Sequence, residues 1–357
     1  MPLVLTPPNF SETVKSPDRL QKLFELGATT EFQETIQRAN ERYTHWHRFR
    51  YVPIPNGLTH EEVWALLKLG RRANFKQAPF TDKQGVPFWY WIPDALQRYL
   101  HDIDVWAGGN IVSEHPGPLP GKEQYIIRSL MDEAIASSQL EGAATTTKKA
   151  KELLQTRRKP KDRSEQMILN NWETMQFIRE NRKVSLSKEL VIEIHQRITA
   201  DTLDHPEDSG RLRVSNEIVV EYKGETVHIP PDFKLLPERL EAFCEFANED
   251  SQSKWVHPVI KAVMLHFWLA YDHPFSDGNG RTARALMYWY LLSRDYLLFE
   301  YLAISRYIQK SPGQYVHAYV HTETDENDLT YFLLYNLRAT KLACEEILSY
   351  IGRKQKE

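Results

Sequence analysis

One stretch near residue 273 gathers the kinds of side chain that handle phosphate groups. It reads HPFSDGNGRTAR, with a histidine, an aspartate and two arginines, and with two glycines around an asparagine. Pro274 disfavours helical dihedrals in the residue before it, so we expect a helix to end at His273. The next helix should begin by about Arg281, which places the DGNG turn at a helix N-terminus. Free backbone N–H groups and the positive end of the helix dipole attract anions there.

The side chains of this turn suit the same chemistry. Gly278 and Gly280 allow a ligand to approach the backbone closely. Arg281 and Arg284 are three residues apart, so they share one helix face. Guanidinium groups suit phosphate oxygens, and Asn279 can add an amide donor.

Two further side chains supply a metal ligand and a base. Asp277 offers the hard oxygen that Mg²⁺ prefers, and Mg²⁺ commonly binds one or two carboxylates plus substrate phosphates. His273 can take a proton near neutral pH. The residues therefore indicate a polyphosphate site that transfers a phosphate-containing group to a hydroxyl. From the residues alone, a helix corner whose arginines pair with local carboxylates is equally open.

The stretch resembles, position for position, the HPFx(D/E)GNGRxxR signature of the Fic-domain family. The preceding HPVIKAVMLHFWLAYDHPF and the later ISRYIQKSPGQYVHAYVHTE also resemble this family, over roughly residues 120–340. Helical patterning predicts an all-α fold with one small hairpin and a mainly helical N-terminal region. The resemblance implies a Fic-type helical core with a β-hairpin flap. It also implies transfer of AMP from ATP to a Ser, Thr or Tyr hydroxyl of a target protein, with release of pyrophosphate.

The resemblance assigns a role to each residue of the motif. His273 is expected to deprotonate the attacking hydroxyl, and Asp277 to bind Mg²⁺. Asn279 is expected at the α-phosphate, Arg281 at the phosphates being displaced and Arg284 at the γ-phosphate. The full set expected to bind the phosphates is Gly278, Asn279, Gly280, Arg281 and Arg284. Asp272 departs from the apolar residue common before HPF in the family, and we expect its charge to raise the pKa of His273.

A second motif lies upstream, in IASSQLEGAAT. It resembles the inhibitory (S/T)xxxE(G/N) motif of the same family, with Ser137, Glu141 and Gly142 at the defined positions. The resemblance implies that Glu141 reaches Arg284 and blocks the γ-phosphate position, because a carboxylate competes for the same donors. The chain then belongs with the class whose brake precedes the Fic core. Without the resemblance, Glu141 would be a solvated surface charge.

Two β-rich runs flank Lys223 and Gly224, a pair that suits a tight hairpin turn. This hairpin, at about residues 216–230, resembles the family's flap, which docks a target segment by strand pairing. A hairpin without a docking role is the alternative, although exposed sheet edges are usually suppressed unless used. The residues expected to dock the target are Glu217, Ile218, Val219, Val220, Val227, His228 and Ile229. The segment GRLR at 210–213 also resembles the family.

The rest of the chain is patterned mainly as helix. Residues 88–92 suit a short strand. The Gly- and Pro-rich segment GGNIVSEHPGPLPGK predicts a linker. We therefore place a boundary near residue 120, between a mainly helical region at 1–120 and a Fic domain at 121–357, with an inhibitory helix at about 130–142 and the active-site loop at 273–284. Apolar residues at helical spacing predict helices at about 30–50, 59–74, 94–106, 123–154 with a split near Gly142, 164–181, 187–200, 237–248, 258–271, 282–294 and 329–351.

Composition excludes several classes of protein. The formal net charge of −3 gives no reason to expect nucleic-acid binding. No apolar run approaches the roughly 18 residues of a membrane span, and the N-terminus is too short and Pro-broken for a signal peptide. Cys244 and Cys344 lie far apart, which argues against a disulfide framework.

We therefore expect a cytoplasmic enzyme with ATP, Mg²⁺ and a target protein as partners, and no membrane. Homodimer formation is open. So are three alternative activities, namely AMP removal, transfer of another nucleotide or phosphate-containing group, and non-enzymatic nucleotide sensing.

Overall fold

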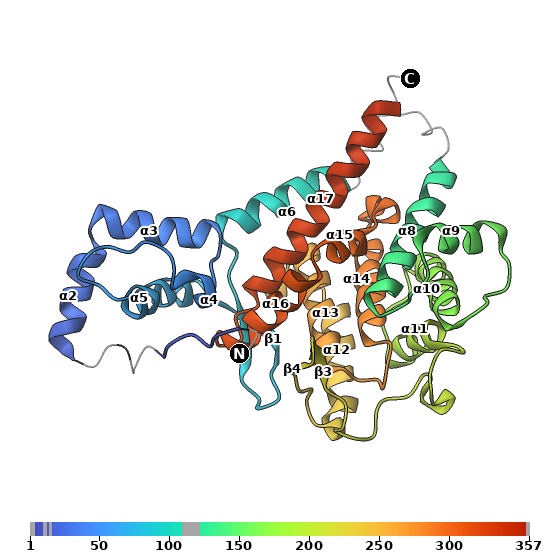
Figure 1. Cartoon of the computed structure of the whole chain (residues 1–357), viewed down its shortest axis with the longest axis horizontal. Helices are drawn as coiled ribbons and strands as arrows, with labels where there is room; N and C mark the ends of the chain where they lie inside the picture. The colour runs from blue at the N-terminus through green and yellow to red at the C-terminus, as the bar shows by residue number, and fades with distance from the viewer. Residues whose placement is uncertain (1–3, 10–12, 14–15, 109–121, 355–357) are drawn as a thin grey trace. The chain divides into compact units, whose positions relative to one another are not determined.

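The computed structural model describes residues 4–9, 13, 16–108 and 122–354, and in these ranges it is mainly helical (Figure 1). The sheets within them are two two-stranded hairpins. The expected all-α fold with a small hairpin and a mainly helical N-terminal region is confirmed. The predicted boundary near residue 120 lies outside the described residues. By its internal contacts the chain divides into two compact units, each built from three segments.

Unit 1 consists of residues 1–98, 221–227 and 316–334. Phe32, Trp46, Phe49 and Trp64 form the centre of its apolar core. The helix expected over 30–50 is interrupted, because Tyr43 takes a positive φ of 44°. The elements lying wholly in this unit are α2 (Pro17–Gly27), α3 (Thr30–Glu41), α4 (Trp46–Phe49), α5 (His60–Arg72), β1 (Lys76–Thr81) and β2 (Pro87–Tyr90).

The hairpin of β1 and β2 was only half anticipated from the sequence. Strand β2 falls near the expected strand at 88–92, whereas β1 was not predicted. Pro79 argues against a strand because proline cannot donate to a sheet ladder. The antiparallel pairing tolerates it because the register shifts between Gln77 and Thr81, where Pro79 lies.

A buried polar network holds the third segment of unit 1 to the first. Lys68 lies 3.0 Å from a carboxylate oxygen of Asp325 and 3.5 Å from one of Asp328. Tyr43 donates to Asp328 over 2.7 Å, and Tyr331 donates to Asp325 over 2.7 Å. All five residues are buried. Burying charges is costly unless they are paired, so these contacts must form together.

We predict that Lys68→Met lowers the free energy of unfolding by about 3 kcal/mol, because two buried carboxylates lose their cation. Urea unfolding of the full chain measures this. The matched control is Arg72→Met, which breaks the ion pair with Glu326 at side-chain exposures of 40% and 47%. That exposed pair should contribute at most about 1 kcal/mol. Equal losses for the two variants would contradict the importance of the buried network.

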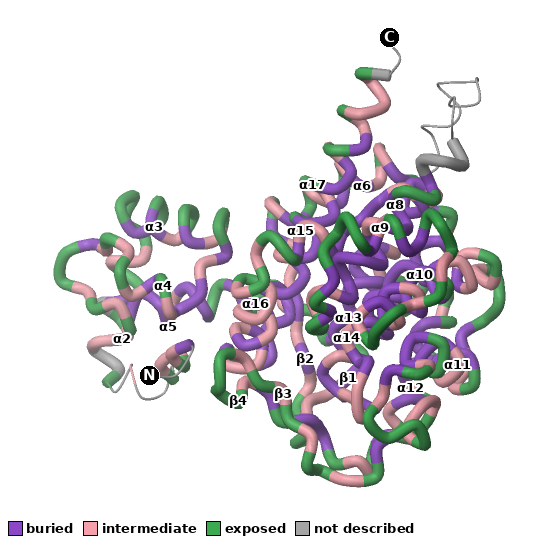
Figure 2. The backbone as a smooth tube through the Cα atoms, turned by 45° about the vertical axis from the view of Figure 1, so that its right-hand side comes forward, coloured by how far each residue is buried: buried purple, intermediate pink, exposed green. Residues whose placement is uncertain are grey.

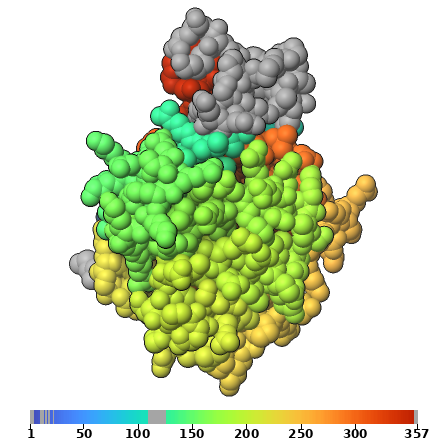
Figure 3. All heavy atoms as spheres, turned by 90° about the vertical axis from the view of Figure 1, so that its right-hand side faces the viewer, coloured from blue at the N-terminus to red at the C-terminus, as the bar shows by residue number. Residues whose placement is uncertain are grey.

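Unit 2 consists of residues 99–220, 228–315 and 335–357, and it holds the candidate site. Helices α13 and α14 are buried on nearly all faces, as expected for helices at the centre of a core. Figure 2 shows both as largely buried. The green to yellow-green segment that includes α9, α10 and α11 forms the face seen in Figure 3. The helices lying wholly in this unit are α8 (Lys122–Leu140), α9 (Thr147–Thr156), α10 (Arg163–Glu180), α11 (Lys188–Thr199), α12 (Leu236–Asn248), α13 (Pro258–Asp272), α14 (Asn279–Ser293) and α15 (Ile304–Lys310).

Several elements run from one unit into the other. They are α6 (Asp94–Ala107), α16 (Pro312–Thr324), α17 (Thr330–Lys354) and the hairpin of β3 (Val220–Tyr222) and β4 (Glu225–His228). Lys223 and Gly224 turn the hairpin with φ values of 54° and 78°, the pattern of a type I′ turn. The predicted hairpin is confirmed but is shorter than expected, with Glu217, Ile218, Val219 and Ile229 outside its strands. Among the described helices, none has the length and apolarity to cross a bilayer.

Candidate active site

The motif occupies the turn between α13 and α14. Helix α13 ends at Asp272, and His273 closes it in the left-handed conformation, with φ 46° and ψ 56°. Gly278, at φ 81°, is the N-cap residue of α14, which begins at Asn279. A side chain at Gly278 would also collide, since its Cβ would lie 2.7 Å from Cγ2 of Thr199. The expected helix end is therefore present, and the DGNG turn leads into a helix N-terminus as expected, with the helix starting two residues earlier than expected.

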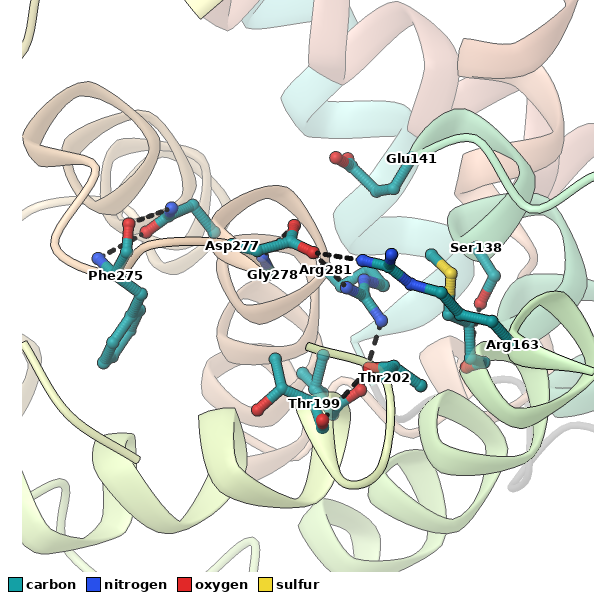
Figure 4. Close-up of polar contacts among 12 residues, drawn as sticks. Ser138, Glu141, Arg163, Thr199, Thr202, Phe275, Asp277, Gly278 and Arg281 are labelled. Carbon is teal, nitrogen blue, oxygen red and sulfur yellow. Dashed lines mark hydrogen bonds and ion pairs between the residues drawn. The ribbon is translucent and has the colours of Figure 1, made fainter. Parts of the chain in front are cut away.

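The amide of Asn279 holds this turn closed. Its Oδ1 accepts from the N–H of Phe275 over 3.0 Å, and its Nδ2 donates to the Phe275 carbonyl over 2.8 Å (Figure 4). The side chain is buried and both ends of its amide are used within the loop. The expected contact of Asn279 with an α-phosphate therefore stays a prediction. With this side-chain arrangement, Asn279 offers a phosphate its backbone N–H.

His195 on α11 supports the turn from below, and sequence reasoning missed it. Its ring stacks on Phe275 with centroids 3.7 Å apart. Its Nδ1 accepts from the Gly210 N–H over 3.1 Å, so the proton lies on Nε2, which donates to the Asp277 carbonyl at 2.9 Å. Burial lowers the pKa of His195 to about 4, which keeps the ring neutral. A single histidine in an amphipathic helix carries no sequence signal for this role.

His273 has the tautomer required of a general base. Its Nδ1 lies 3.2 Å from the Ala270 carbonyl, and a carbonyl can only accept, so Nδ1 carries the proton. Nε2 is then left with a free lone pair. Burial, more than any neighbouring charge, lowers the pKa of His273 to about 4. The imidazole is therefore neutral at physiological pH.

The expectation that Asp272 raises the pKa of His273 is wrong. The Asp272 carboxylate is buried. It accepts hydrogen bonds from Arg239 Nε at 2.8 Å and from Trp268 Nε1 at 3.0 Å, and so faces these partners rather than His273. Burial raises the pKa of Asp272 itself. Adjacency in sequence misled the prediction, because the left-handed turn at His273 sends the two side chains to different surroundings.

Arg213, in the GRLR segment, is a second support that sequence reasoning did not assign. Its guanidinium donates to the carbonyl of His273 at 2.9 Å, to that of Ser215 at 2.8 Å and to that of Pro231. Its backbone N–H donates to the Pro274 carbonyl at 2.9 Å. One buried side chain therefore ties the start of the active loop to the chain on both sides of the β3–β4 hairpin.

The upstream motif meets the second arginine of the loop. Arg284 is buried and donates from Nε to the Ser137 hydroxyl at 2.9 Å and from Nη2 to the Ser137 carbonyl at 3.0 Å. The same Nη2 donates to the Glu141 carboxylate at 2.9 Å. The structure therefore brings Ser137, Glu141 and Arg284 together as the resemblance implied.

Gly142 and Gly280 make this contact sterically feasible. Gly142, at φ 94°, follows Glu141 in a Schellman motif, with the Ala143 N–H donating to the Ser138 carbonyl at 3.0 Å. At Gly280, an added Cβ would lie only 2.1 Å from Oε1 of Glu141. The carboxylate thus rests in the space that the missing side chain leaves above the first turn of α14. An anion already occupies the predicted anion site.

Helix α8, which ends at Leu140 directly before Glu141, is fixed to the core by a buried carboxylate. Glu133 accepts from Tyr288 Oη at 2.9 Å and from the Ser305 N–H at 2.8 Å, and burial raises its pKa. Ser138 Oγ donates to the Met167 carbonyl on α10 at 3.2 Å. These contacts hold the helix in the register that points Glu141 at Arg284.

Arg281 is buried with its hydrogen-bonding capacity only partly used. Its Nη1 donates to the Ile198 carbonyl at 3.1 Å, whereas Nε and Nη2 have no hydrogen-bond partner among the described residues. Asp277 lies close by, with Oδ2 at 3.8 Å from Nη2. In Figure 4, Glu141, Asp277 and Arg281 lie around one space. Buried N–H groups without protein partners are rare, and these can donate to an acceptor that enters this space.

The predicted docking residues lie on or beside the β3–β4 hairpin. Val219 and Ile229 are exposed, the latter to 52%, and Glu217 is exposed as well. Ile218, Val220 and Val227 are half-buried. His228 is buried, with Nε2 2.6 Å from the Tyr271 carbonyl, so it anchors the hairpin rather than offering a surface.

Comparisons with known proteins find Fic proteins. Residues 185–291 match the model of the Fic/DOC family. The protein adenylyltransferase Fic of Nematostella vectensis is 29% identical over 198 residues, covering 54% of this chain and 44% of that protein. The protein of the same name from Drosophila melanogaster is 31% identical over 165 residues, covering 44% and 31%.

Solved structures show the same fold. Fic-1 of C. elegans (residues 134–508) aligns over 95% of this chain and 90% of its own, with a TM-score of 0.63 and 17% identity. A Fic family protein from Desulfovibrio desulfuricans G20 aligns over 77% of each chain, with a TM-score of 0.61 and 19% identity.

The fold is that of the solved Fic structures. The Fic/DOC family model matches residues 185–291, less than half of this chain. The alignments span less than half the length of the two curated relatives.

We predict that Arg213→Met lowers the free energy of unfolding by about 2–4 kcal/mol, because several buried carbonyls lose a charged donor. Chemical denaturation of the full chain measures this. Arg211→Met is the control, since Arg211 is exposed and its removal should cost less than about 0.5 kcal/mol. A loss for Arg213→Met no larger than that of the control would show that the hydrogen bonds of the Arg213 side chain do not stabilise the fold.

Proposed function

We propose that this chain is a protein adenylyltransferase that transfers AMP from ATP to a Ser, Thr or Tyr hydroxyl of a target protein. The observation that carries the proposal is the occupied anion site beside a neutral base. A carboxylate held by Arg284 lies over Gly280 at the N-terminus of α14, in the same loop as His273. The relatives named protein adenylyltransferase Fic support the same activity.

His273 acts as the base. The hydroxyl oxygen of the target attacks the α-phosphorus, and its proton passes to Nε2 of His273. The bond from the α-phosphorus to the oxygen that bridges to the β-phosphate breaks, and pyrophosphate leaves with that electron pair. The Nδ1 hydrogen bond to Ala270 keeps Nε2 unprotonated and the ring correctly oriented before each reaction.

The phosphates bind at the start of α14, with the γ-phosphate where the Glu141 carboxylate now lies. Backbone N–H groups at the start of α14, exposed by Gly278 and Gly280, face the anion together with Arg281 and Arg284. Arg281 supplies two buried N–H groups without partners among the described residues. Fixed donors of this kind stabilise charge that develops on the phosphates, without reorganisation during the reaction.

Asp277 fits the expected Mg²⁺ contact. Its Oδ1 accepts from the Gly278 N–H at 2.5 Å, while Oδ2 faces the space around Arg281. Among the described residues no group of three or more His, Cys, Asp or Glu side chains could hold a metal. Mg²⁺ does not need such a cage, because it binds through one or two carboxylates, waters and substrate phosphates. When bound, it would offset negative charge on those phosphates.

Glu141 acts as an internal brake. Its carboxylate takes one donor of Arg284 and fills the space over Gly280, so a γ-phosphate and Glu141 cannot occupy the site together. Ser137 holds the other side of the same guanidinium. Removing the Glu141 side chain therefore frees a donor without disturbing the fold of α8.

The β3–β4 hairpin docks the target segment. Its strands are short, and Val219 and Ile229 beside them are exposed apolar side chains. A sheet edge offers backbone donors and acceptors that accept many sequences. We also propose a cytosolic setting, in keeping with two cysteines, Cys244 and Cys344, that are both free and buried.

We predict that Glu141→Gly raises covalent labelling of lysate proteins from ATP labelled at the α-phosphate by at least tenfold. The added change His273→Ala should then lower labelling by about 10²–10⁴, the usual contribution of a general base. Gel autoradiography of purified variants mixed with lysate measures both.

Glu152→Gly is the control, because Glu152 is exposed on α9 and should leave labelling at the wild-type level. No increase for Glu141→Gly, in a preparation whose wild type is active, would refute the brake. Nucleotide binding without any labelled protein would favour a nucleotide sensor over a transferase.

The buried His273 also predicts the pH dependence of the Glu141→Gly variant. A base works when neutral, and a pKa of about 4 keeps His273 neutral from pH 7 down to about pH 5. The negative charge of Glu141 raises the pKa of His273, so its removal in the variant lowers that pKa and moves the acidic limit to lower pH. We therefore expect kcat/KM to hold between pH 7 and about 5.5, with circular dichroism confirming the fold. An acidic limb centred near 6.5, the ordinary histidine value, would contradict this environment.

A further inference from the structure

Arg163, the last residue of the basic run RRKPKDR at 157–163, lies beside Asp277 of the motif. Its Nη2 is 3.6 Å from Oδ2 of Asp277, and its Nη1 donates to Asp204 at 2.7 Å. Figure 4 shows the side chain extending from α10 toward Asp277 and Arg281. The guanidinium is half exposed, so it is accessible to a ligand in this space.

The turn before α10 places this side chain firmly. Asp162 caps the helix, with its carboxylate accepting from the Glu165 N–H at 2.9 Å. The Glu165 carboxylate accepts from Arg158 at 2.6 and 2.7 Å and from the Lys161 N–H at 2.8 Å. Arg163 is the first residue of α10, so its position follows from a well-bonded turn rather than from a free loop.

The present partners of the two guanidinium groups leave room for another anion. Asp277 Oδ2 faces Arg163 at 3.6 Å and Arg281 at 3.8 Å, both longer than a hydrogen bond. Asp277 already accepts the Gly278 N–H on its other oxygen. Arg281 is buried with two N–H groups lacking partners among the described residues. The guanidinium groups of Arg163 and Arg281 thus face one oxygen of Asp277 beyond hydrogen-bond distance. Both can donate to a further acceptor between them.

We propose that Arg163 is a further nucleotide-binding residue, whose guanidinium contacts the phosphate chain of bound ATP from the side of Asp277. This assignment rests on the proposed function, since it presumes that the site binds ATP. It adds a cation from α10 to the two supplied by α14. Guanidinium groups bind phosphate oxygens through charge-assisted hydrogen bonds, which are stronger than neutral ones. Asp204 keeps the group in place when the site is empty of nucleotide.

Isothermal titration calorimetry with the purified full chain tests this assignment. The background is Glu141→Gly, so that the brake does not obscure binding, and the ligands are ATP and adenosine. Adding Arg163→Gln should weaken ATP binding about tenfold, the lower end of the effect of a charged hydrogen bond. Adenosine binding should change less than about twofold. Arg163→Lys should recover part of the ATP affinity, because it restores the charge without the planar fork.

Arg157→Gln is the matched control. It removes a charge from the same basic run, on an exposed side chain, and should leave ATP affinity unchanged. Equal ATP affinity with and without Arg163→Gln, while Arg281→Gln weakens it, would overturn the assignment and leave the proposed function intact. An equal loss for ATP and adenosine would show that Arg163 only shapes the fold, and would also overturn it. Failure of the Glu141→Gly chain to bind ATP would instead overturn the proposed function.

Discussion

A single buried guanidinium, that of Arg284, determines which anion occupies the N-terminal end of α14. A buried cation is costly unless it is paired, so this side chain must always have oxygen partners. At rest these are Ser137 and Glu141. In the proposed function, a nucleotide binds fully only by replacing the Glu141 carboxylate, which exchanges one anion for another at the same donors. The proposed brake and the proposed substrate site then share one guanidinium.

The catalytic loop owes its shape to side chains that bind backbone rather than substrate. Asn279 closes the turn on Phe275, His195 holds the Asp277 carbonyl, and Arg213 holds the His273 carbonyl. Of the groups expected to contact a nucleotide, these contacts use the side-chain amide of Asn279. The loop is thus preorganised, with its N–H groups and the Nε2 atom of His273 already in place before a ligand arrives.

Local rules anticipated the local parts of this site. Pro274 and Gly278 mark a helix end and a helix start, and the structure has both. The pairing of Glu141 with Arg284 came from family resemblance, because 143 residues separate them and no spacing rule connects them. His195 and Arg163 carry no motif, since their roles exist only once α10 and α11 pack beside the loop. Arg213 lies in the GRLR segment, whose resemblance to the family assigned it no role. The prediction that Asp272 raises the pKa of His273 was wrong for the opposite reason, because the two residues are adjacent in sequence but their side chains are not neighbours in space.

The most direct test of this account compares ATP and ADP binding to the wild type and to Glu141→Gly by calorimetry. ADP lacks the γ-phosphate that competes with Glu141 for Arg284. The account predicts that Glu141→Gly strengthens ATP binding at least tenfold, about 1.4 kcal/mol, while ADP binding changes less than about threefold. Equal strengthening of both nucleotides, or of neither, would contradict the central claim that Glu141 and the γ-phosphate exclude each other at one guanidinium.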